Sequence, residues 1–337
     1  MTDGTSTWAV VATVHEPPML VVAFVAWHLS LGASEIMLYF DDPTDPAADL
    51  VAALPGVRVL RCDNAHWRRL CRHRPDKHQI RQSRNAVHAY HACPADWLLH
   101  CDADEFVWAT GPVSDFLSAV QSQTQCVIAP VAERIYHAGT KPSSVFNGAF
   151  RRPFAGKRVM GRHLFGRGYA MTHRGLTGHA IGKSFLRRGA PIIPSIHRPK
   201  SADRTDIPTE HADALTLLHF DGLTPLHWVY KILRKADAVA NHGGLQPSRH
   251  RQRQIDAVLA DPCAAVDVYH RLKQVDAAAM KTLMRENLVL EAEFAPNPAV
   301  AAHFPELDTA FSAEAVDRWL WDNKSALLDS FGLKPPR

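Results

Sequence analysis

The stretch Trp97-Leu98-Leu99-His100-Cys101-Asp102-Ala103-Asp104-Glu105-Phe106 is the most informative part of the sequence for the fold. The stretch predicts a buried strand from Trp97 to Phe106, and its acids lie toward the end of that strand. If the strand pleat continues to its end, Asp102 and Asp104 project on the same side, because side chains two apart share a face. Such close carboxylates repel each other unless a cation or protons lie between them. Since carboxylate oxygens suit hard divalent ions, the pattern predicts a metal site, and the alternative is a loop whose acids cap the next helix.

The segments before this stretch alternate between strand and helix patterns. Apolar β-rich runs predict strands at 8–14, 36–40 and 57–60, and helix-length windows lie at 19–31, from 47, and at 80–90. On the last helix, Ile80, Ser83, Val87 and Tyr90 describe one face. This order predicts an α/β fold, in which a mostly parallel sheet has helices on its faces. In such sheets ligands bind beyond the carboxyl ends of the strands.

The composition excludes several classes of protein. The chain has 337 residues, of which 46% are apolar and 21% charged, unlike collagen-like, coiled-coil or disordered chains. The longest apolar run, at 19–33, is shorter than the roughly 20 residues of a bilayer-spanning helix.

Six cysteines without a Cys-x-x-Cys pair predict reduced core thiols. No secretory signal is visible, so we expect a cytoplasmic protein without a transmembrane segment and leave peripheral membrane association open.

Charge is distributed in blocks along the chain. Residues 134–202 contain fourteen Lys or Arg and no acid, whereas the remainder carries 24 basic and 34 acidic residues. This asymmetry predicts an anionic partner, and the alternative is a surface balanced by acids from elsewhere in the fold. Aromatic residues in the stretch could stack nucleic-acid bases. The acidic remainder and the lack of a nucleic-acid module favour sugar or nucleotide contacts instead, so we expect no nucleic-acid partner.

An ordered set of short motifs runs through the first two thirds of the chain. Residues 82–86 read Gln-Ser-Arg-Asn-Ala, and residues 102–106 read Asp-Ala-Asp-Glu-Phe. Further motifs are Val14-His15-Glu16, Tyr39 to Asp45, Gly182-Lys183-Ser184, Leu218-His219-Phe220, and Lys231 with Arg234. Together they resemble the family 2 glycosyltransferases of GT-A fold, and residues 102–106 match the metal motif of a bacterial subgroup. The resemblance covers about residues 8 to 235 and is specific only as an ordered set. His15 departs from the Asn of the family, and Pro43 stiffens a turn that is usually more polar.

The resemblance implies a Rossmann-like GT-A domain at 1–235, with a nucleotide-binding half at 1–108 and an acceptor half at 109–235. Residues 236–337 would then form a helical C-terminal extension. The implied enzyme is a hexosyltransferase that depends on Mn²⁺ or Mg²⁺. It would move a sugar from a nucleoside-diphosphate donor to a hydroxyl of a glycan, a lipid-linked acceptor or a small molecule. We expect inversion and leave retention, the sugar, the base, the acceptor and the oligomeric state open.

The resemblance also assigns roles to individual residues. Asp102, Asp104 and His219 would bind the metal. Thr13 and Glu16 would flank the base or ribose, and Asp41 or Asp42 would face the base. Arg84 with Asn85 would reach the ribose or diphosphate. Lys231 would screen the charge of the leaving group.

An inverting transfer needs a general base, commonly a carboxylate in this family. Because no acid lies between Glu133 and Asp203, the candidates are Glu133, the group of Asp203, Asp206 and Glu210, and the metal motif itself. We choose Glu133, and a histidine, His179 or His197, is the competing option.

Two other classes of function use the same features. A nucleotidyl- or phosphotransferase would use the same carboxylate pair with Mg²⁺, and a non-catalytic nucleotide-sugar-binding protein would keep the fold without turnover.

Overall fold

The computed structural model describes residues 5–140, 142–203, 205–241, 243–307 and 310–335. They fall into two compact units that alternate along the chain. Unit 1 comprises Met1–Pro130, Ile181–Leu217 and Pro296–Asp308, and unit 2 comprises Val131–Ala180, Leu218–Ala295 and Thr309–Arg337. The predicted boundaries at 108 and 235 do not coincide with these units. The chain returns to unit 1 after residue 180 because two later strands complete its sheet.

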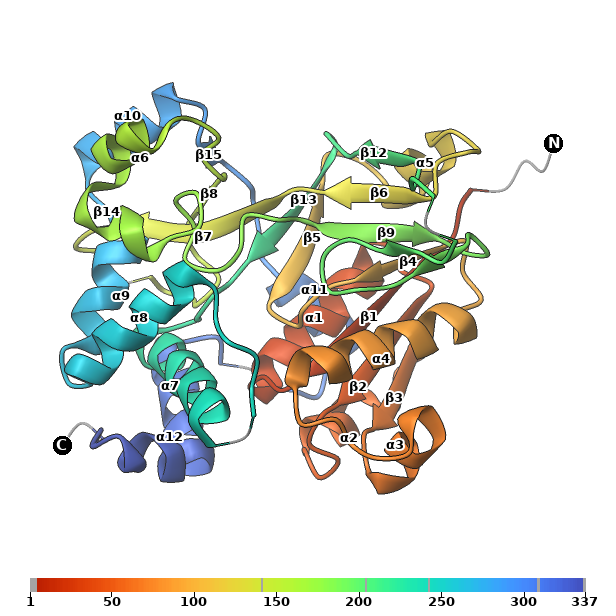
Figure 1. Ribbon diagram of the computed structural model, residues 1–337, viewed down its shortest axis with the longest axis horizontal. Coiled ribbons are helices and arrows are strands. Elements are labelled where there is room, and N and C mark those ends of the chain that lie inside the picture. The colour runs from red at the N-terminus through yellow and green to blue at the C-terminus, as the bar shows by residue number, and fades with distance from the viewer. Residues whose placement is uncertain (1–4, 141, 204, 242, 308–309, 336–337) are drawn as a thin grey trace. The chain divides into compact units, whose positions relative to one another are not determined.

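Unit 1 is built on a seven-stranded sheet of order β12-β6-β9-β4-β1-β2-β3 (Figure 1). The strands are β1 (Trp8–Val14), β2 (Glu35–Phe40), β3 (Val57–Arg61), β4 (Trp97–His100), β6 (Cys126–Ala129), β9 (Lys183–Arg187) and β12 (Thr209–His211). β1 pairs in parallel with β2 and β4, and β2 with β3, whereas β9 runs antiparallel to β4 and β6. The predicted α/β class and the parallel strands of the first half are confirmed, and the whole sheet is mixed.

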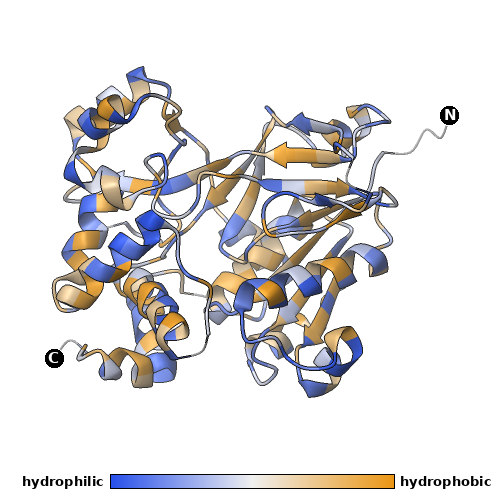
Figure 2. Cartoon of the chain, in the orientation of Figure 1, coloured by the Kyte–Doolittle hydropathy of each residue, from blue (hydrophilic) through white to orange (hydrophobic). Residues whose placement is uncertain are grey.

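Helices cover the strands of this sheet. Unit 1 also contains α1 (Pro18–Ser30), α2 (Ala47–Val51), α3 (Asn64–Cys71), α4 (His78–Ala92), β5 (Glu105–Ala109), α5 (Val113–Ala119), β10 (Ile192–Ile193), β11 (Lys200–Ser201) and α11 (Asn297–His303). Every residue of β1 is buried, and α1 is buried from Leu20 to Ala26. Strands buried on both faces are apolar throughout, and Figure 2 shows β1 and β4 largely in the hydrophobic colour.

The predicted strand from 97 to 106 is wrong in its second half. β4 ends at His100, and a turn separates it from β5, which begins at Glu105. In this turn the Glu105 amide donates to the Asp102 carbonyl over 3.0 Å. Aspartate is common in turns because its short polar side chain competes with the strand ladder for backbone hydrogen bonds. The pleat therefore does not continue through Asp102 and Asp104.

Of the predicted helical face of α4, Tyr90 is buried, whereas Ile80 is exposed. The buried side chains of this helix are Arg81, Gln82, Asn85, Ala86, Ala89 and Tyr90. Ile80 is 41% exposed. Polar residues face inward here because polar groups at the strand ends provide their hydrogen-bond partners.

Unit 2 contains a smaller sheet and most of the later helices. Its strands are β7 (Val131–His137), β8 (Ala149–Arg151), β14 (Gln274–Val275) and β15 (Val289–Leu290), in the order β15-β8-β7 with β14 also paired to β7. Its helices are α6 (Arg158–Phe165), η1 (Gly166–Met171), α7 (Pro225–Asn241), α8 (Arg249–Ala260), α9 (Ala265–Lys273), α10 (Ala277–Arg285) and α12 (Ala313–Ser330). β13 (Leu215–His219) leads from unit 1 into unit 2.

The predicted helical extension at 236–337 is correct only in part. α8, α9, α10 and α12 lie in this segment, but so do the short strands β14 and β15. Its residues 296–308 belong to unit 1, where α11 packs on α1. No helix of the described residues is long and apolar enough to cross a membrane.

Candidate functional site

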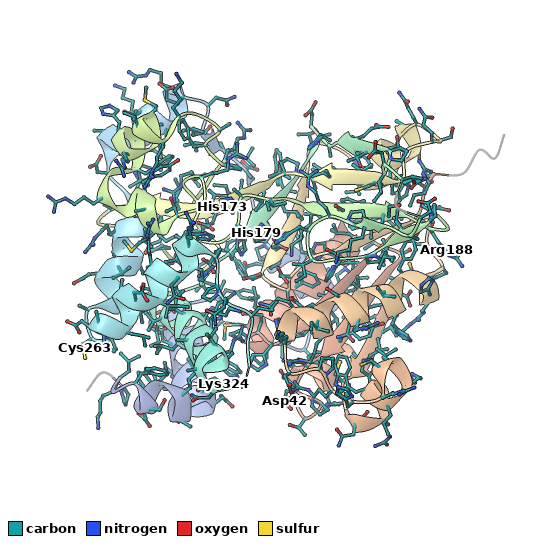
Figure 3. The ribbon with its side chains drawn as sticks, in the orientation of Figure 1. Asp42, His173, His179, Arg188, Cys263 and Lys324 are labelled. Atoms are coloured by element: carbon teal, nitrogen blue, oxygen red, sulfur yellow. The ribbon has the colours of Figure 1, made fainter. Side chains whose placement is uncertain are left out.

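A pocket of about 470 Å³ lies at the carboxyl ends of β1, β2 and β3 in unit 1. Its lining residues belong to unit 1, and all but Arg74, which lies after α3, follow these strands closely: His15, Asp41, Asp42, Pro43, Cys62, Asp63, Asn64 and Arg74. Asp42, labelled in Figure 3, lies in the loop after β2 and accepts hydrogen bonds from the amide and hydroxyl of Thr44. This is the position at which parallel sheets of α/β proteins bind their ligands.

Asp41 forms the buried wall of this pocket. Its carboxylate accepts hydrogen bonds from Arg81 Nε over 2.6 Å and from an Arg81 terminal nitrogen over 2.7 Å, and Arg74 approaches to 3.1 Å. Burial alone would raise the pKa of Asp41, but the hydrogen bonds and charge of Arg81 hold it below its usual value. Asp41 is therefore an anion whose partners are supplied by the protein.

The side chains of α4 connect this pocket to the acidic turn. Arg81 contacts Asp41 after β2, and Gln82 donates to Asp102 Oδ1 after β4 over 2.7 Å. Asn85 is fully buried and donates to the Thr13 hydroxyl of β1 over 3.1 Å. One helix thus contacts the ends of three strands of the parallel sheet.

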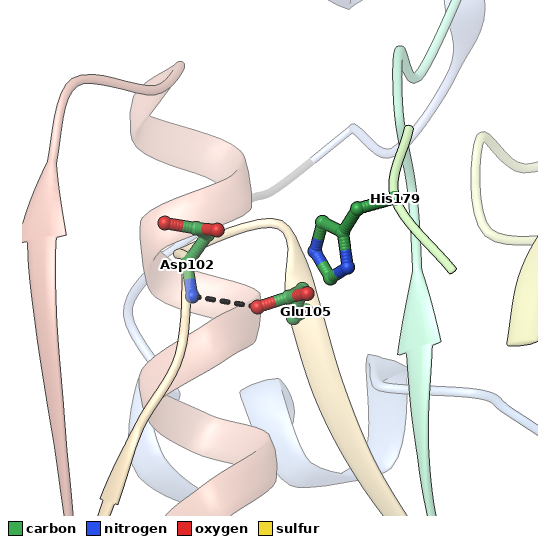
Figure 4. A group of neighbouring side chains, drawn as sticks. All are labelled: Asp102, Glu105 and His179. Carbon is green, nitrogen blue, oxygen red and sulfur yellow. Dashed lines mark hydrogen bonds between the residues drawn. The ribbon is translucent and has the colours of Figure 1, made fainter. Parts of the chain in front are cut away.

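The acidic turn of residues 102–105 holds a buried lysine. Lys183 Nζ lies 2.6 Å from Asp102 Oδ2 and 3.3 Å from Glu105 Oε2, and its side chain is fully buried. The Asp102 amide donates to Glu105 Oε2 over 2.8 Å (Figure 4). Burial alone would lower the pKa of Lys183, but the charges of Asp102 and Glu105 raise it above its usual value. Lys183 therefore remains an ammonium ion.

The carboxylates that the turn brings together are those of Asp102 and Glu105. Their oxygens lie within 4.8 Å of each other, close enough to share a metal ion. Asp104, the predicted partner of Asp102, is 3% exposed and does not belong to this group. Because one ammonium opposes two carboxylates, net negative charge remains, and this oxygen donor set suits a divalent cation such as Mg²⁺ or Mn²⁺.

Sequence reasoning missed the roles of Glu105 in this turn and of Lys183, which contacts the turn from β9. Lys183 lies in the Gly-Lys-Ser match, and the glycine before it is the signal that could have identified it. A Cβ added at Gly182 would lie 1.9 Å from the Ala129 carbonyl oxygen of β6. Only glycine allows β9 to approach this closely, and the approach places Lys183 at the turn.

The other predicted ligand-binding residues have varied positions. Thr13 is buried beneath Asn85, and Glu16 is half-buried just after β1. Arg84 is exposed on α4, so the inward arginine of this helix is Arg81 instead. Lys231 belongs to unit 2, where it is half-buried on α7.

Glu133, the predicted general base, is fully buried in unit 2. Thr177 donates to its Oε1 from both amide and hydroxyl, the Gly178 amide donates to Oε2 over 2.7 Å, and Lys273 Nζ lies 2.9 Å from Oε1. Burial would raise the pKa of Glu133, but the charges of Lys273, His219 and Arg151 hold it well below its usual value. A carboxylate so placed is poorly suited to accept a proton from a substrate, which argues against the predicted role.

His219, the predicted third metal ligand, lies beside Glu133 in unit 2. Its Nδ1 is 3.6 Å from Glu133 Oε2, and its ring stacks on that of His179 at 5.3 Å. A Cβ at Gly178 would lie 2.4 Å from the His219 ring, so this glycine provides the space for it. The role of His219 as a metal ligand stays a prediction.

Comparisons with known proteins add little to this geometry. No protein-family model and no curated protein matches the chain. Solved structures do match, among them the crystal structure of HddC from Yersinia pseudotuberculosis, with 11% sequence identity and a TM-score of 0.27. The match covers 39% of this chain and 60% of the HddC chain. A similarity this slight supports no statement on activity.

Proposed function

We propose that this protein is a divalent-metal-dependent glycosyltransferase. It would transfer a hexosyl group from a nucleoside-diphosphate donor to an acceptor hydroxyl, with inversion. The observation that carries this proposal is the position of α4, whose Arg81 and Gln82 contact Asp41 at the strand-end pocket and Asp102 at the acidic turn. A nucleotide-sized pocket next to a cation-binding turn is the arrangement that a nucleoside diphosphate requires.

Glycosyl transfer builds negative charge on the leaving diphosphate while the sugar becomes oxocarbenium-like. A Mn²⁺ or Mg²⁺ ion held by Asp102 and Glu105 would supply Lewis-acid stabilisation of that charge. Lys183 orients both carboxylates from within the protein, and Gln82 holds the other oxygen of Asp102. The turn is therefore pre-organised by its own neighbours, which lowers the entropic cost of binding.

The pocket would take the base and ribose. Asp41 is engaged by two arginines, so of the two predicted base-facing aspartates we propose Asp42 as the one that contacts the nucleoside. Asn64 adds an amide to the same pocket. Because Glu133 is held by its own partners, we propose the histidine candidate of unit 1, His197, as the general base.

A screen of nucleotide-sugars tests the proposal. The protein is incubated with each donor and Mn²⁺, and released nucleoside diphosphate and sugar products are identified. We expect diphosphate release from one class of donor, loss of this activity in Asp102→Asn and Glu105→Gln, and full activity in the exposed control Asp115→Asn.

Two outcomes would contradict it. Pyrophosphate release from nucleoside triphosphates would assign a nucleotidyltransferase instead. A higher melting temperature with nucleoside diphosphate, but no turnover of any donor, would indicate a binding protein.

A further inference from the structure

A second pocket lies in unit 2, and the proposed function does not use it. It encloses about 210 Å³, and its walls include Arg134, Tyr136, Thr140, Tyr269, His270 and Gln274. We call it the Arg134 pocket. A neighbouring hollow of about 440 Å³ shares Tyr136 and Thr140 with it. Together the two have the size of a small-molecule site.

The alternation of β7 places Arg134 at this pocket. Glu133 and Arg134 are neighbours on the strand, so their side chains point to opposite faces, while Arg134 and Tyr136 share one. On its own face of the strand, Glu133 forms an ion pair with Lys273. Arg134 and Tyr136 both line the pocket, with the guanidinium carbon 5.8 Å from the Tyr136 ring centre.

The charge of Arg134 has no acidic counterpart. Its side chain is 3% exposed and donates to the carbonyls of Val145, Gly222 and Leu223 and to the Tyr269 hydroxyl. Within the described part of the chain, no carboxylate forms an ion pair with it. Buried charges are normally paired, so the pocket keeps a positive potential that an anionic group can neutralise. Arg134 is also the first residue of the acid-free stretch.

The remaining walls suit a polyhydroxylated ring. The ring of Tyr136 packs on the buried ring of Tyr269, with centroids 6.1 Å apart at 36°, and forms an apolar wall of the pocket. The amide of Gln274, the imidazole of His270 and the hydroxyl of Thr140 add hydrogen-bonding groups around it. A small number of polar groups arranged around aromatic walls is typical of small-molecule sites.

We propose that the Arg134 pocket binds a sugar that carries a negative charge, such as a sugar phosphate or a sugar acid. Arg134 would neutralise the anionic group, the Tyr136 ring would pack on the sugar ring, and Gln274 and Thr140 would bind its hydroxyls. The proposal is independent of the proposed transferase function, because residues of unit 2 alone line the pocket.

Isothermal titration calorimetry with three probes tests it on the full chain. We expect glucose 1-phosphate to bind at least about tenfold more tightly than glucose. The free energy of one charge-assisted hydrogen bond is large enough to change the dissociation constant by that factor. Inorganic phosphate should also bind about tenfold more weakly than glucose 1-phosphate, because it leaves the tyrosine walls empty. Equal affinity for glucose 1-phosphate and either of the other probes would overturn the proposal.

Variants test whether glucose 1-phosphate binds in the Arg134 pocket. Tyr136→Leu, which removes the aromatic wall, and Gln274→Ala should each weaken glucose 1-phosphate binding about five- to tenfold, whereas Tyr169→Leu, a matched change elsewhere in unit 2, should leave it unchanged. Melting temperatures show that each variant is folded. Asp102→Asn should not change the affinity for glucose 1-phosphate, and if it abolishes this binding, the site lies in unit 1 and the proposal fails. Uridine diphosphate binding reports separately on unit 1.

Discussion

Among single residues, Lys183 is the buried cation that contacts both carboxylates of the acidic turn. Its ammonium lies within 3.3 Å of both Asp102 and Glu105, and neither Lys183 nor Glu105 is exposed. Like charges repel strongly where water is excluded. A divalent cation at the two carboxylates must therefore bind against the charge of Lys183, and the free protein should hold metal only weakly.

Lys183→Met should tighten Mn²⁺ binding about tenfold or more, because it removes a positive charge a few ångströms from the ligands. Electron paramagnetic resonance of free Mn²⁺ during titration measures the affinity. The control is Lys200→Met, an exposed lysine of unit 1. Unchanged or weaker binding in Lys183→Met would show that metal does not share the carboxylates with this lysine.

The pair of Asp41 and Arg81 gives a prediction for stability and pH. Asp41→Asn leaves Arg81 buried without a counterion, which should cost about 3 kcal/mol at neutral pH. The pKa of Asp41 is lowered on folding from its ordinary value of 3.8. Its ionised form therefore stabilises the folded state above that value, and this contribution is lost as the pH falls below it.

Chemical denaturation of both proteins between pH 7 and pH 2.5 measures this contribution. The gap between wild type and Asp41→Asn should be widest near neutral pH and should close below about pH 4. Asp49→Asn is the control, since Asp49 is 79% exposed in its pair with Arg61 and such pairs contribute less than about 1 kcal/mol. A gap that is constant across this range would mean that Asp41 is not a stabilising anion.

Among the elements, the contact between β6 and β9 places Lys183. A methyl group at residue 182 cannot fit beside the Ala129 carbonyl unless the strands separate. Gly182→Ala should therefore destabilise the protein by about 2 kcal/mol or more. Gly111→Ala, where a Cβ meets no atom within 4 Å, is the matched control and should be near neutral. Similar melting temperatures for the two variants would contradict the close packing of β6 and β9.

The elements also show what the sequence could predict. Strands β1, β2 and β3 match their predicted ranges within one residue, because buried parallel strands are continuous apolar runs that stand out in any sequence. The inward face of α4 does not show in the hydrophobic pattern, since its buried residues include Arg81, Gln82 and Asn85. Their positions depend on partners that lie on distant strands, and single-sequence periodicity carries no information about those partners.

The acidic turn shows the same limit. The motif itself predicted carboxylates at a strand end, and this is confirmed for Asp102. Which acid accompanies it depends on the path of the turn, and this path brings Glu105 rather than Asp104 to Lys183. The role of Lys183 depends on β9, which follows the turn by some eighty residues in the chain and reaches it only through antiparallel pairing with β4.

Across the chain as a whole, the two units alternate. Unit 2 takes residues from three separate segments, and its buried ion pair joins Glu133 to Lys273 over 2.9 Å. A fragment of residues 1–235 therefore lacks the partner of a fully buried carboxylate. We expect unit 2 not to fold in this fragment, because an unpaired buried charge costs about 3–5 kcal/mol. Circular dichroism melting compares it with the full chain, and a fragment that keeps the melting temperature and the signal change per residue of the full chain would contradict this account.

The proposed function requires that the turn of residues 102–105 bind a divalent cation together with a nucleoside diphosphate. The decisive measurement is the Mn²⁺ affinity of the protein with and without uridine diphosphate, determined by electron paramagnetic resonance. It is made on the wild type and on the variants Asp102→Asn and Asp115→Asn. We predict that the nucleotide tightens Mn²⁺ binding at least about tenfold in wild type and in the exposed control, because its phosphates add anionic ligands. Asp102→Asn should abolish this effect. Equal tightening in Asp102→Asn, or none in wild type, would contradict metal-assisted nucleotide binding at this turn.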